Sequence, residues 1–261
     1  MSGSRHNGEI SLPAARQQRW QPMRGGLLNI YRYDYQEFRY EDGRLLLRGN
    51  NGTGKSRVLA LQLPFLLDGE IIPQRVEPDQ DPAKRMEWNL LLGGKHDDRL
   101  GYTWIEFGRI TEAGNAEYKT LGCALRAVQG YGIRQQWFFI TSLRIGHDLF
   151  LVNETDQPLS KTKLETVLGD KGKVFGTGKV EDDRLDYRTA VNKLLFGLGD
   201  RYDGLLNLLI QLRQPQLSRK LDEDRLSSAL SQALPPLPDK VLADVAEAFR
   251  SLETDRQELA D

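Results

Sequence analysis

The order of apolar and polar positions predicts a β-rich first half of the chain. Residues 26–33 (GLLNIYRY) and 37–49 (EFRYEDGRLLLRG) favour strands around a turn at Glu41-Asp42-Gly43. Three more β-rich segments, at 101–110, 118–128 and 134–152, are separated by turns rich in Gly, Asn and Asp. Short strands joined in this way are typical of an antiparallel meander.

Aromatic residues alternate roughly with polar ones near the start of this region, at Tyr31, Tyr33, Tyr35, Phe38 and Tyr40. The alternation favours strand faces that are half-buried. The stacking of one of these tyrosines on an adenine ring is the alternative.

Helical patterns follow. The run VLALQLPFLL (58–67) is apolar nearly all round and predicts a buried helix that Pro64 bends or ends. Residues 70–98 are rich in Pro, Asp and Gly and predict a long loop with at most a short helix. Beyond residue 160, KTKLETVLG (161–169), DRLDYRTAVNKLLFGLG (183–199) and YDGLLNLLIQLRQ (202–214) predict helices, with glycine at the expected ends.

The tail shows heptad spacing. Its seam positions are Leu242, Val245, Phe249, Leu252, Arg256 and Leu259. The seam is shorter than the three to four heptads that identify a coiled coil, so an amphipathic helix packed on its own domain stays open. We therefore expect a flexible N-terminus over 1–24, one main region over 25–237 and the start of a coiled-coil arm over 238–261.

Composition narrows the class of protein. The chain has 261 residues, 39% of them hydrophobic, which is enough for one large domain or two small ones. Its net charge of -1 argues against nucleic-acid binding by bulk charge but leaves a local basic patch possible. Cys123 is the single cysteine, which excludes a disulfide and a zinc cluster. The absence of a secretory signal and of any run of about 20 apolar residues predicts a cytoplasmic protein without a membrane span.

The segment that carries chemistry is GNNGTGKS, residues 49–56, which fits the phosphate-binding pattern G-x-x-x-x-G-K-[ST] at every required position. Glycines let the backbone curl until successive N–H groups point at phosphate oxygens, and the next helix adds its positive end. The run Leu45, Leu46 and Leu47 predicts a buried strand directly before the loop. The pattern therefore predicts ATP and Mg²⁺ as ligands. Lys55 would lie on the β- and γ-phosphates and Ser56 on the metal. The expected cofactor-binding set is Asn51, Gly52, Thr53, Gly54, Lys55, Ser56 and Arg57.

A second half of an ATPase site is missing from the sequence. Hydrolysis usually needs an apolar strand that ends in Asp, to hold Mg²⁺ and position water. The strand TWIEF ends at Glu106 without an aspartate, and WFFITS (137–142) has no acid. No LSGG-like turn occurs, and Asn192-Lys193-Leu194-Leu195 lacks the aspartate of the guanine-binding pattern N-K-x-D.

The chain resembles the N-terminal part of SMC/Rad50-type ABC ATPase heads. The resemblance lies in the form G-x-N-G-x-G-K-S of the loop, in the β meander, and in IQLRQPQ (210–216), which is similar to a Q-loop strand. It implies an α/β P-loop NTPase head with an antiparallel β layer, a helical lobe and the start of a coiled coil. It also implies that Gln214 contacts Mg²⁺ and the attacking water, with Gln211 and Gln216 as alternatives. Pro215 departs from the glycine common at that position.

A narrower resemblance is to the JetC-type SMC-like ATPase subunits of Wadjet plasmid-defence systems. Phrases that carry it are GRLLLRGNNGTGKSRVLALQLPFLLDG, MEWNLLLGG, RLGYTWIEFGR and LLIQLRQPQLSRKL, between residues 43 and 220. It implies an ATP-driven motor that extrudes DNA loops and acts against plasmids. Its implied partners are the C-terminal half of the same head, a second SMC-like head, a kleisin, a winged-helix subunit and a nuclease subunit.

DNA would be held through its phosphates by surface cations. The candidates are Arg85, Lys95, Arg99, Arg134 and Arg144. The alternatives are a self-contained small-molecule or nucleoside kinase, another Rad50- or SbcC-like DNA-repair ATPase head, and a module that binds ATP without hydrolysing it. A kinase would transfer phosphate by itself, whereas a head half needs its C-terminal part.

Overall fold

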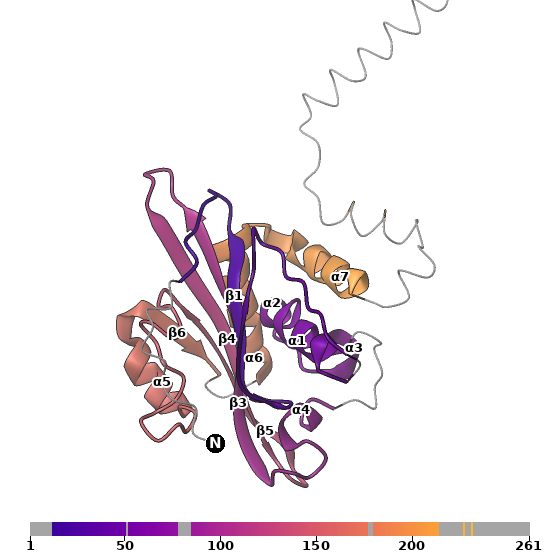
Figure 1. Ribbon diagram of the computed structural model, residues 1–261. Coiled ribbons are helices and arrows are strands. Elements are labelled where there is room, and N and C mark those ends of the chain that lie inside the picture. Colours follow the sequence, from indigo (N-terminus) through magenta and orange to yellow (C-terminus); the bar gives the residue numbers. More distant parts are fainter. Residues whose placement is uncertain are drawn as a thin grey trace, which may run out of the picture.

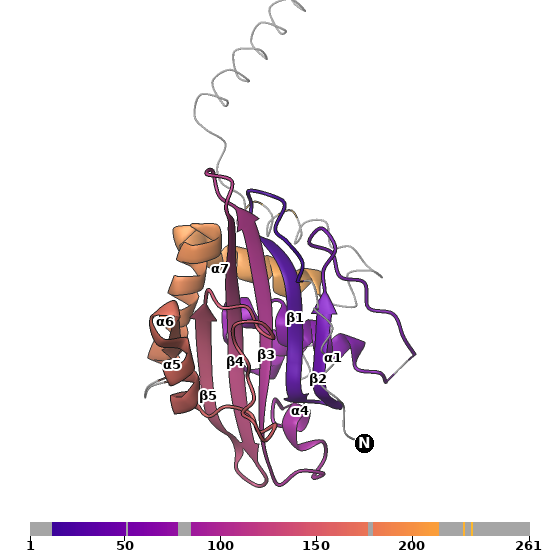
Figure 2. The same ribbon diagram turned by 60° about the vertical axis from the view of Figure 1, so that its left-hand side comes forward.

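The computed structural model describes residues 12–50, 52–77, 85–176 and 180–213, and the single positions 227 and 231. Six strands form one antiparallel sheet in the order β2-β1-β3-β4-β5-β6 (Figures 1 and 2). The strands are β1 Gln21–Ile30, β2 Tyr33–Arg39, β3 Asp98–Ile110, β4 Ala116–Val128, β5 Gly132–Thr141 and β6 Gly172–Phe175. The protein is therefore α/β, and strands β3, β4 and β5 confirm the predicted meander.

One face of the sheet carries most of the helices. These are α1 Lys55–Gln62, α2 Phe65–Asp68, α3 Pro73–Val76, α4 Trp88–Leu91, α6 Val180–Val191 and α7 Tyr202–Leu212. A π-helix, Asn192–Phe196, and a 3₁₀ turn, Gly199–Arg201, connect α6 to α7. Buried apolar side chains from these helices and from β1, β3, β4 and β5 form the larger hydrophobic core. The prediction at Pro64 is confirmed, because the helix ends at Gln62 and a second short helix starts at Phe65.

The opposite face carries a smaller core under helix α5, Lys161–Leu168 (Figure 1). A 3₁₀ turn, Gly169–Lys171, leads from α5 into β6. Leu164 and Leu168 of this helix pack in one cluster with Trp104 and Tyr102 of β3. The three helices predicted after residue 160 exist, and α5 packs on the face of the sheet opposite to α6 and α7.

A buried ion cluster links the strands on this second face. The Glu106 carboxylate accepts hydrogen bonds from Arg24 at 3.2 and 2.7 Å and from Arg144 at 3.1 and 2.7 Å. Arg24 also donates to the Ile145 carbonyl, and Arg144 donates to the Pro13 carbonyl. The cluster therefore joins β1, β3, the segment after β5 and the residues that precede β1.

Two expectations for the first 50 residues need correction. The sequence predicts a flexible N-terminus over residues 1–24, but β1 begins at Gln21 and Arg24 is fully buried. Ala15 is buried as well, and its N–H donates to the Tyr118 hydroxyl at 3.2 Å. The segment before β1 packs on the sheet because its backbone finds partners on β3 and β4.

The second correction concerns the strand predicted before the loop. Residues 45–50 form no strand, and the Leu46 side chain is 73% exposed. The expected hairpin around Asp42 is reduced to an isolated bridge between Glu41 and Arg44. A strand needs a neighbour to take its backbone hydrogen bonds, and no described strand lies beside this segment.

The other predicted features are the loop over 70–98, the coiled-coil arm and the lack of a membrane span. The predicted loop over 70–98 contains α3 and α4, each of four residues, and residues 78–84 lie outside the described part. The coiled-coil arm over 238–261 also lies outside it. In the part of the chain that is described, no helix has both the length and the apolar character needed to cross a bilayer.

Candidate nucleotide-binding site

The loop 49–56, which matches the phosphate-binding pattern, follows the irregular residues 45–48 and runs into the first turn of α1. Three of its glycines have positive φ: 152° at Gly49, 81° at Gly52 and 92° at Gly54. Gly54 is the N-cap of α1, in the left-handed region that L side chains avoid. The glycines that the motif requires therefore occupy positions where the loop reverses direction into the helix.

Lys55 lies in the curve of this loop. Its Nζ donates to the carbonyl oxygens of Gly49 at 2.6 Å and Asn50 at 2.7 Å. The Thr53 hydroxyl donates to the same Asn50 carbonyl at 2.9 Å. The loop is thus folded around its own ammonium group, which is where the pattern placed the phosphates.

The first turn of α1 leaves donors available. No described residue accepts a hydrogen bond from the backbone N–H groups of Gly54, Lys55 or Ser56. Ser56 is exposed, with its hydroxyl one residue beyond the lysine. Free amides at a helix N-terminus, next to an ammonium group and a hydroxyl, suit a phosphate with a bound cation.

Two tyrosines support the loop from the β1–β2 turn. The Tyr33 hydroxyl donates to the Thr53 carbonyl at 2.8 Å, and the Tyr31 hydroxyl to the Gly52 carbonyl at 3.4 Å. Burial and then the neighbouring Tyr31 raise the pKa of Tyr33, so its hydroxyl stays protonated as a donor. A Cβ on Gly54 would lie 2.8 Å from the Tyr33 hydroxyl and 2.9 Å from the Tyr31 ring.

The sequence did not identify this support. It predicted half-buried strand faces for the aromatic residues, and Tyr33 does lie in β2. Tyr31 instead occupies the turn between the strands, with φ of 55°. The tyrosines precede the loop by about twenty residues, so only the turn geometry shows that their hydroxyls meet it.

Arg57 points away from the loop. The sequence placed it with the cofactor-binding residues, but its guanidinium pairs with the buried carboxylate of Glu77. Glu77 follows α3, and its carbonyl lies 3.4 Å from a guanidinium nitrogen of Arg213 at the end of α7. The Arg57 side chain therefore holds helix α1 to the segment after α3, and only its backbone N–H, which donates to the Gly54 carbonyl at 2.9 Å, meets the loop.

The expected metal ligands are only partly described. Asn51 and Gln214 lie outside the described residues. Within the described ranges, no group of three His, Cys, Asp or Glu side chains is placed to hold a metal ion. A Mg²⁺ ion at this site would therefore depend on the Ser56 hydroxyl and on the phosphates, together with groups that are not described.

Glu106 is the acid that the sequence offers in place of the missing catalytic aspartate, but its carboxylate is held in the buried ion cluster. Glu106 lies inside β3, four residues before its end, and is fully buried between Arg24 and Arg144. Burial raises its pKa, but the hydrogen bonds from Arg144 and Arg24 outweigh burial, and the net effect is a pKa below its usual value. Glu106 is therefore a structural ion and has no free oxygen to activate water.

The candidate DNA-contact residues separate into two groups. Arg85, Lys95 and Arg134 are exposed, whereas Arg99 is buried and donates to the Tyr31 carbonyl at 2.9 Å. Arg144 belongs to the buried ion cluster.

Comparison with known proteins adds no relative: no protein-family model and no curated protein matches this chain.

Proposed function

We propose that this chain is the nucleotide-binding, N-terminal part of an SMC/Rad50-type ATPase head, and that it works in an ATP-driven DNA motor of the Wadjet type. The observation that supports it most directly is the loop itself. Lys55 lies inside a curve of backbone whose glycines have positive φ, at the start of a helix with available amides. The motor and its anti-plasmid role rest on the resemblance of the sequence.

In this proposal Lys55 exchanges its two carbonyl partners for the β- and γ-phosphates of ATP. The loop amides and the first turn of α1 bind phosphate oxygens, and Ser56 orients its hydroxyl toward Mg²⁺. The bound cation neutralises charge on the phosphates. Tyr31 and Tyr33 hold the loop from outside, through the Gly52 and Thr53 carbonyls, so the inward face stays available.

The same proposal accounts for the parts that look incomplete. The leucine segment before the loop has no strand beside it, and Glu106 is unavailable to activate water. The groups that split ATP would come from the C-terminal half of the head and from a second head. Closure of two heads over shared nucleotides would then drive the motor, and hydrolysis would release them.

The experiment measures binding of a fluorescent ATP analogue with Mg²⁺ to the 261-residue chain and to Lys55→Ala. We expect the variant to lose at least 100-fold in affinity, because it removes the charged phosphate ligand. Lys163→Ala on α5, an exposed lysine on the other face, is the matched control and should bind as the wild type does.

Turnover separates the head half from a self-contained enzyme. We expect negligible ATP hydrolysis and no phosphate transfer by the chain alone, and hydrolysis once the C-terminal half is supplied. Brisk hydrolysis by the isolated monomer, or ATP affinity unchanged in Lys55→Ala, would contradict the proposal.

A further inference from the structure

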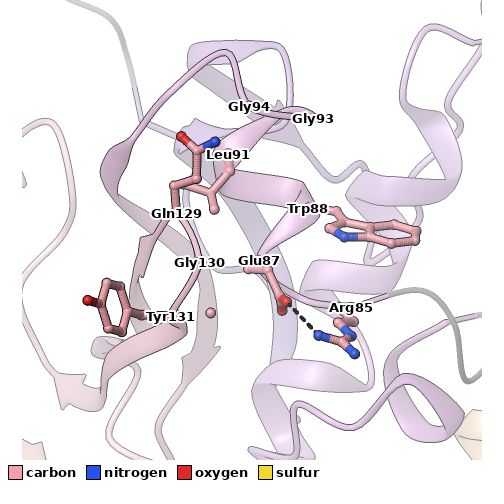
Figure 3. A pocket seen from close by; sticks show the side chains of 10 residues that line it. Arg85, Glu87, Trp88, Leu91, Gly93, Gly94, Gln129, Gly130 and Tyr131 are labelled. Carbon is pink, nitrogen blue, oxygen red and sulfur yellow. Dashed lines mark ion pairs between the residues drawn. The ribbon is translucent and has the colours of Figure 1, made fainter.

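A second candidate site lies between helix α4 and the β4–β5 turn (Figure 3). It is a cavity of about 530 Å³, and its lining residues are Arg85, Glu87, Trp88, Leu91, Gly93, Gly94 and residues 129–132. Trp88 and Tyr131 lie on opposite sides of it in Figure 3, and their side chains are 52% and 72% exposed. In Figure 3 the two rings point outward, away from each other and from the middle of the hollow, so they flank it on opposite sides and face solvent.

Backbone forms much of the floor. Gly93 and Gly130 have φ of 70° and 77°, and a Cβ on either would meet no atom within 4 Å. Both glycines line the cavity together with Gly94 and Gly132. The floor is therefore open above the main chain, and a flat group can approach it without displacing a side chain.

Exposed cations surround the rings. Arg85 lines the cavity, with its Nη1 3.7 Å from the half-buried Glu87 carboxylate, and is 71% exposed. The Arg134 guanidinium lies 5.7 Å from the centre of the Tyr131 ring. Lys95, next to the lining residue Gly94, adds a third exposed cation.

Few carboxylates near these cations are unpaired. Two hydrogen bonds from Arg126, at 2.9 and 2.5 Å, hold Asp98, and those bonds lower its pKa. Asp97 is the remaining exposed carboxylate of that loop. Asp34 is fully exposed as well but pairs with the buried Arg99 at 3.6 Å, so three exposed cations face Asp97 and the paired Glu87, an excess of one positive charge.

We propose that this cavity binds single-stranded nucleic acid. One or two unpaired bases stack on Trp88 and Tyr131, and the adjoining phosphates lie on Arg85 and Arg134. Aromatic platforms interleaved with cations are the arrangement that holds single strands without reading their sequence. Each ring has an arginine three residues away in the sequence, which fits the alternation of base and phosphate better than it fits a peptide. The inference rests on the proposed function only for the class of ligand, which is nucleic acid: the loops that such a motor extrudes are duplex, whereas this site takes an unpaired strand.

The test uses the 261-residue chain and a labelled oligothymidine of about 12 nucleotides, a length within the usual range for such sites. We expect Trp88→Ala and Tyr131→Ala each to weaken binding about tenfold, the typical loss for one stacked base. Phe150→Ala is the matched control, because Phe150 is 59% exposed and lies outside the cavity. It should bind as the wild type does.

Salt dependence separates stacking from charge. Affinity for a single strand falls with salt, and each phosphate contact contributes about 0.7 to the steepness of log affinity against log salt. The double variant Arg85→Gln, Arg134→Gln should therefore make that dependence shallower by about 1.4. Trp88→Ala should weaken binding without changing that slope. An unlabelled blunt duplex should compete poorly, because its bases are already stacked on one another.

The outcomes distinguish this site from the phosphate-binding loop. We expect Lys55→Ala to bind oligothymidine normally, and Trp88→Ala to bind the ATP analogue normally. The inference fails if the aromatic variants bind oligothymidine like the wild type, or if the chain binds none. It also fails if duplex competes as well as single strand, or if Trp88→Ala loses ATP affinity, since the cavity would then belong to the nucleotide site. None of these results changes the expected effect of Lys55→Ala on ATP.

Discussion

Arg24 and Lys55 are both cations held by oxygen atoms, but their surroundings are opposite. Arg24 is fully buried and meets two carboxylates, those of Glu106 and Glu37. Lys55 lies in a half-exposed loop and, among the described residues, its ammonium group meets only the neutral carbonyls of Gly49 and Asn50. The guanidinium cannot leave its partners without stranding a buried charge, whereas the ammonium can exchange neutral carbonyls for an incoming anion at small cost.

The difference separates a polar arrangement that stabilises the fold from one that is suited to binding. The Glu106 cluster satisfies both carboxylate oxygens twice and joins distant segments of the chain. The loop leaves amides at the start of α1 without described acceptors, on a surface that a ligand can reach. Variants at the two places should therefore alter different properties.

The largest effect is expected from Glu106→Gln. The substitution leaves Arg24 and Arg144 without a buried negative charge, so we expect a loss of about 3–5 kcal/mol in the free energy of unfolding. Asp98→Asn is the control, because its pair with Arg126 is solvent-exposed and worth at most about 1 kcal/mol. Urea denaturation measures both. Equal effects would show that the buried cluster is no more important than a surface pair.

The pH dependence has a definite sign. Hydrogen bonds from Arg144 and Arg24 overcome burial and set the folded-state pKa of Glu106 below its usual 4.5. The stabilisation is therefore complete above about pH 4.5 and is lost as the pH falls through the folded-state pKa. The stability gap between the wild type and Glu106→Gln should narrow in that acidic range. A gap that widened on acidification would contradict this assignment.

The buried cluster also shows the limit of prediction from sequence. Arg24 and Glu106 are 82 positions apart, and Glu106 and Arg144 are 38 apart. A charged residue in an alternating strand normally predicts a solvent-facing side, and nothing local indicates a partner on another strand. The pattern of the candidate phosphate-binding loop, by contrast, can be read from the sequence, because its glycines, lysine and serine lie within eight consecutive residues.

The same reasoning explains the leucines before the loop. An apolar run predicts burial, but burial also needs a surface to pack against, and local sequence does not specify one. Leu27 meets such a surface in the main core and is fully buried. Leu46 is 73% exposed, whereas its neighbour Leu47 is partly buried and packs against that core. The second candidate site was partly foreseen, since Arg85, Lys95 and Arg134 were candidate contacts, but the sequence did not place them around Trp88 and Tyr131.

A smaller effect is expected at the loop from Gly54→Ala, with Gly52→Ala as the matched control. Both glycines have positive φ, so either alanine introduces about 1–2 kcal/mol of backbone strain. A Cβ at Gly52 meets nothing within 4 Å, whereas one at Gly54 strikes the two tyrosines. Gly54→Ala should therefore lose more affinity for the ATP analogue than Gly52→Ala.

A double-mutant cycle sharpens this comparison. Tyr33→Phe removes the hydroxyl oxygen that lies 2.8 Å from the added Cβ, and should partly restore binding to Gly54→Ala. Taken alone, Tyr33→Phe should weaken binding, because the Thr53 carbonyl loses its donor. Strict additivity of the two changes would show that the tyrosine does not support the loop.

The smallest effect is expected from Leu46→Ser in the chain alone. This side chain is mostly exposed, so the free energy of unfolding should change by less than about 0.5 kcal/mol. Leu27→Ala, at a fully buried leucine of β1, should cost about 2–5 kcal/mol and fixes the scale for a packed site. A loss above 1 kcal/mol for Leu46→Ser would mean that the segment already packs in this chain.

If the chain is part of the proposed head and the C-terminal half of that head covers this segment, Leu46→Ser should have a large effect instead of a small one. Burying a leucine contributes about 1.5–3 kcal/mol, so Leu46→Ser should then weaken association of the two parts by about tenfold or more. Lys55→Ala should leave that association unchanged in the absence of nucleotide. If the wild type and Leu46→Ser associate with the C-terminal half equally well, that half does not cover Leu46.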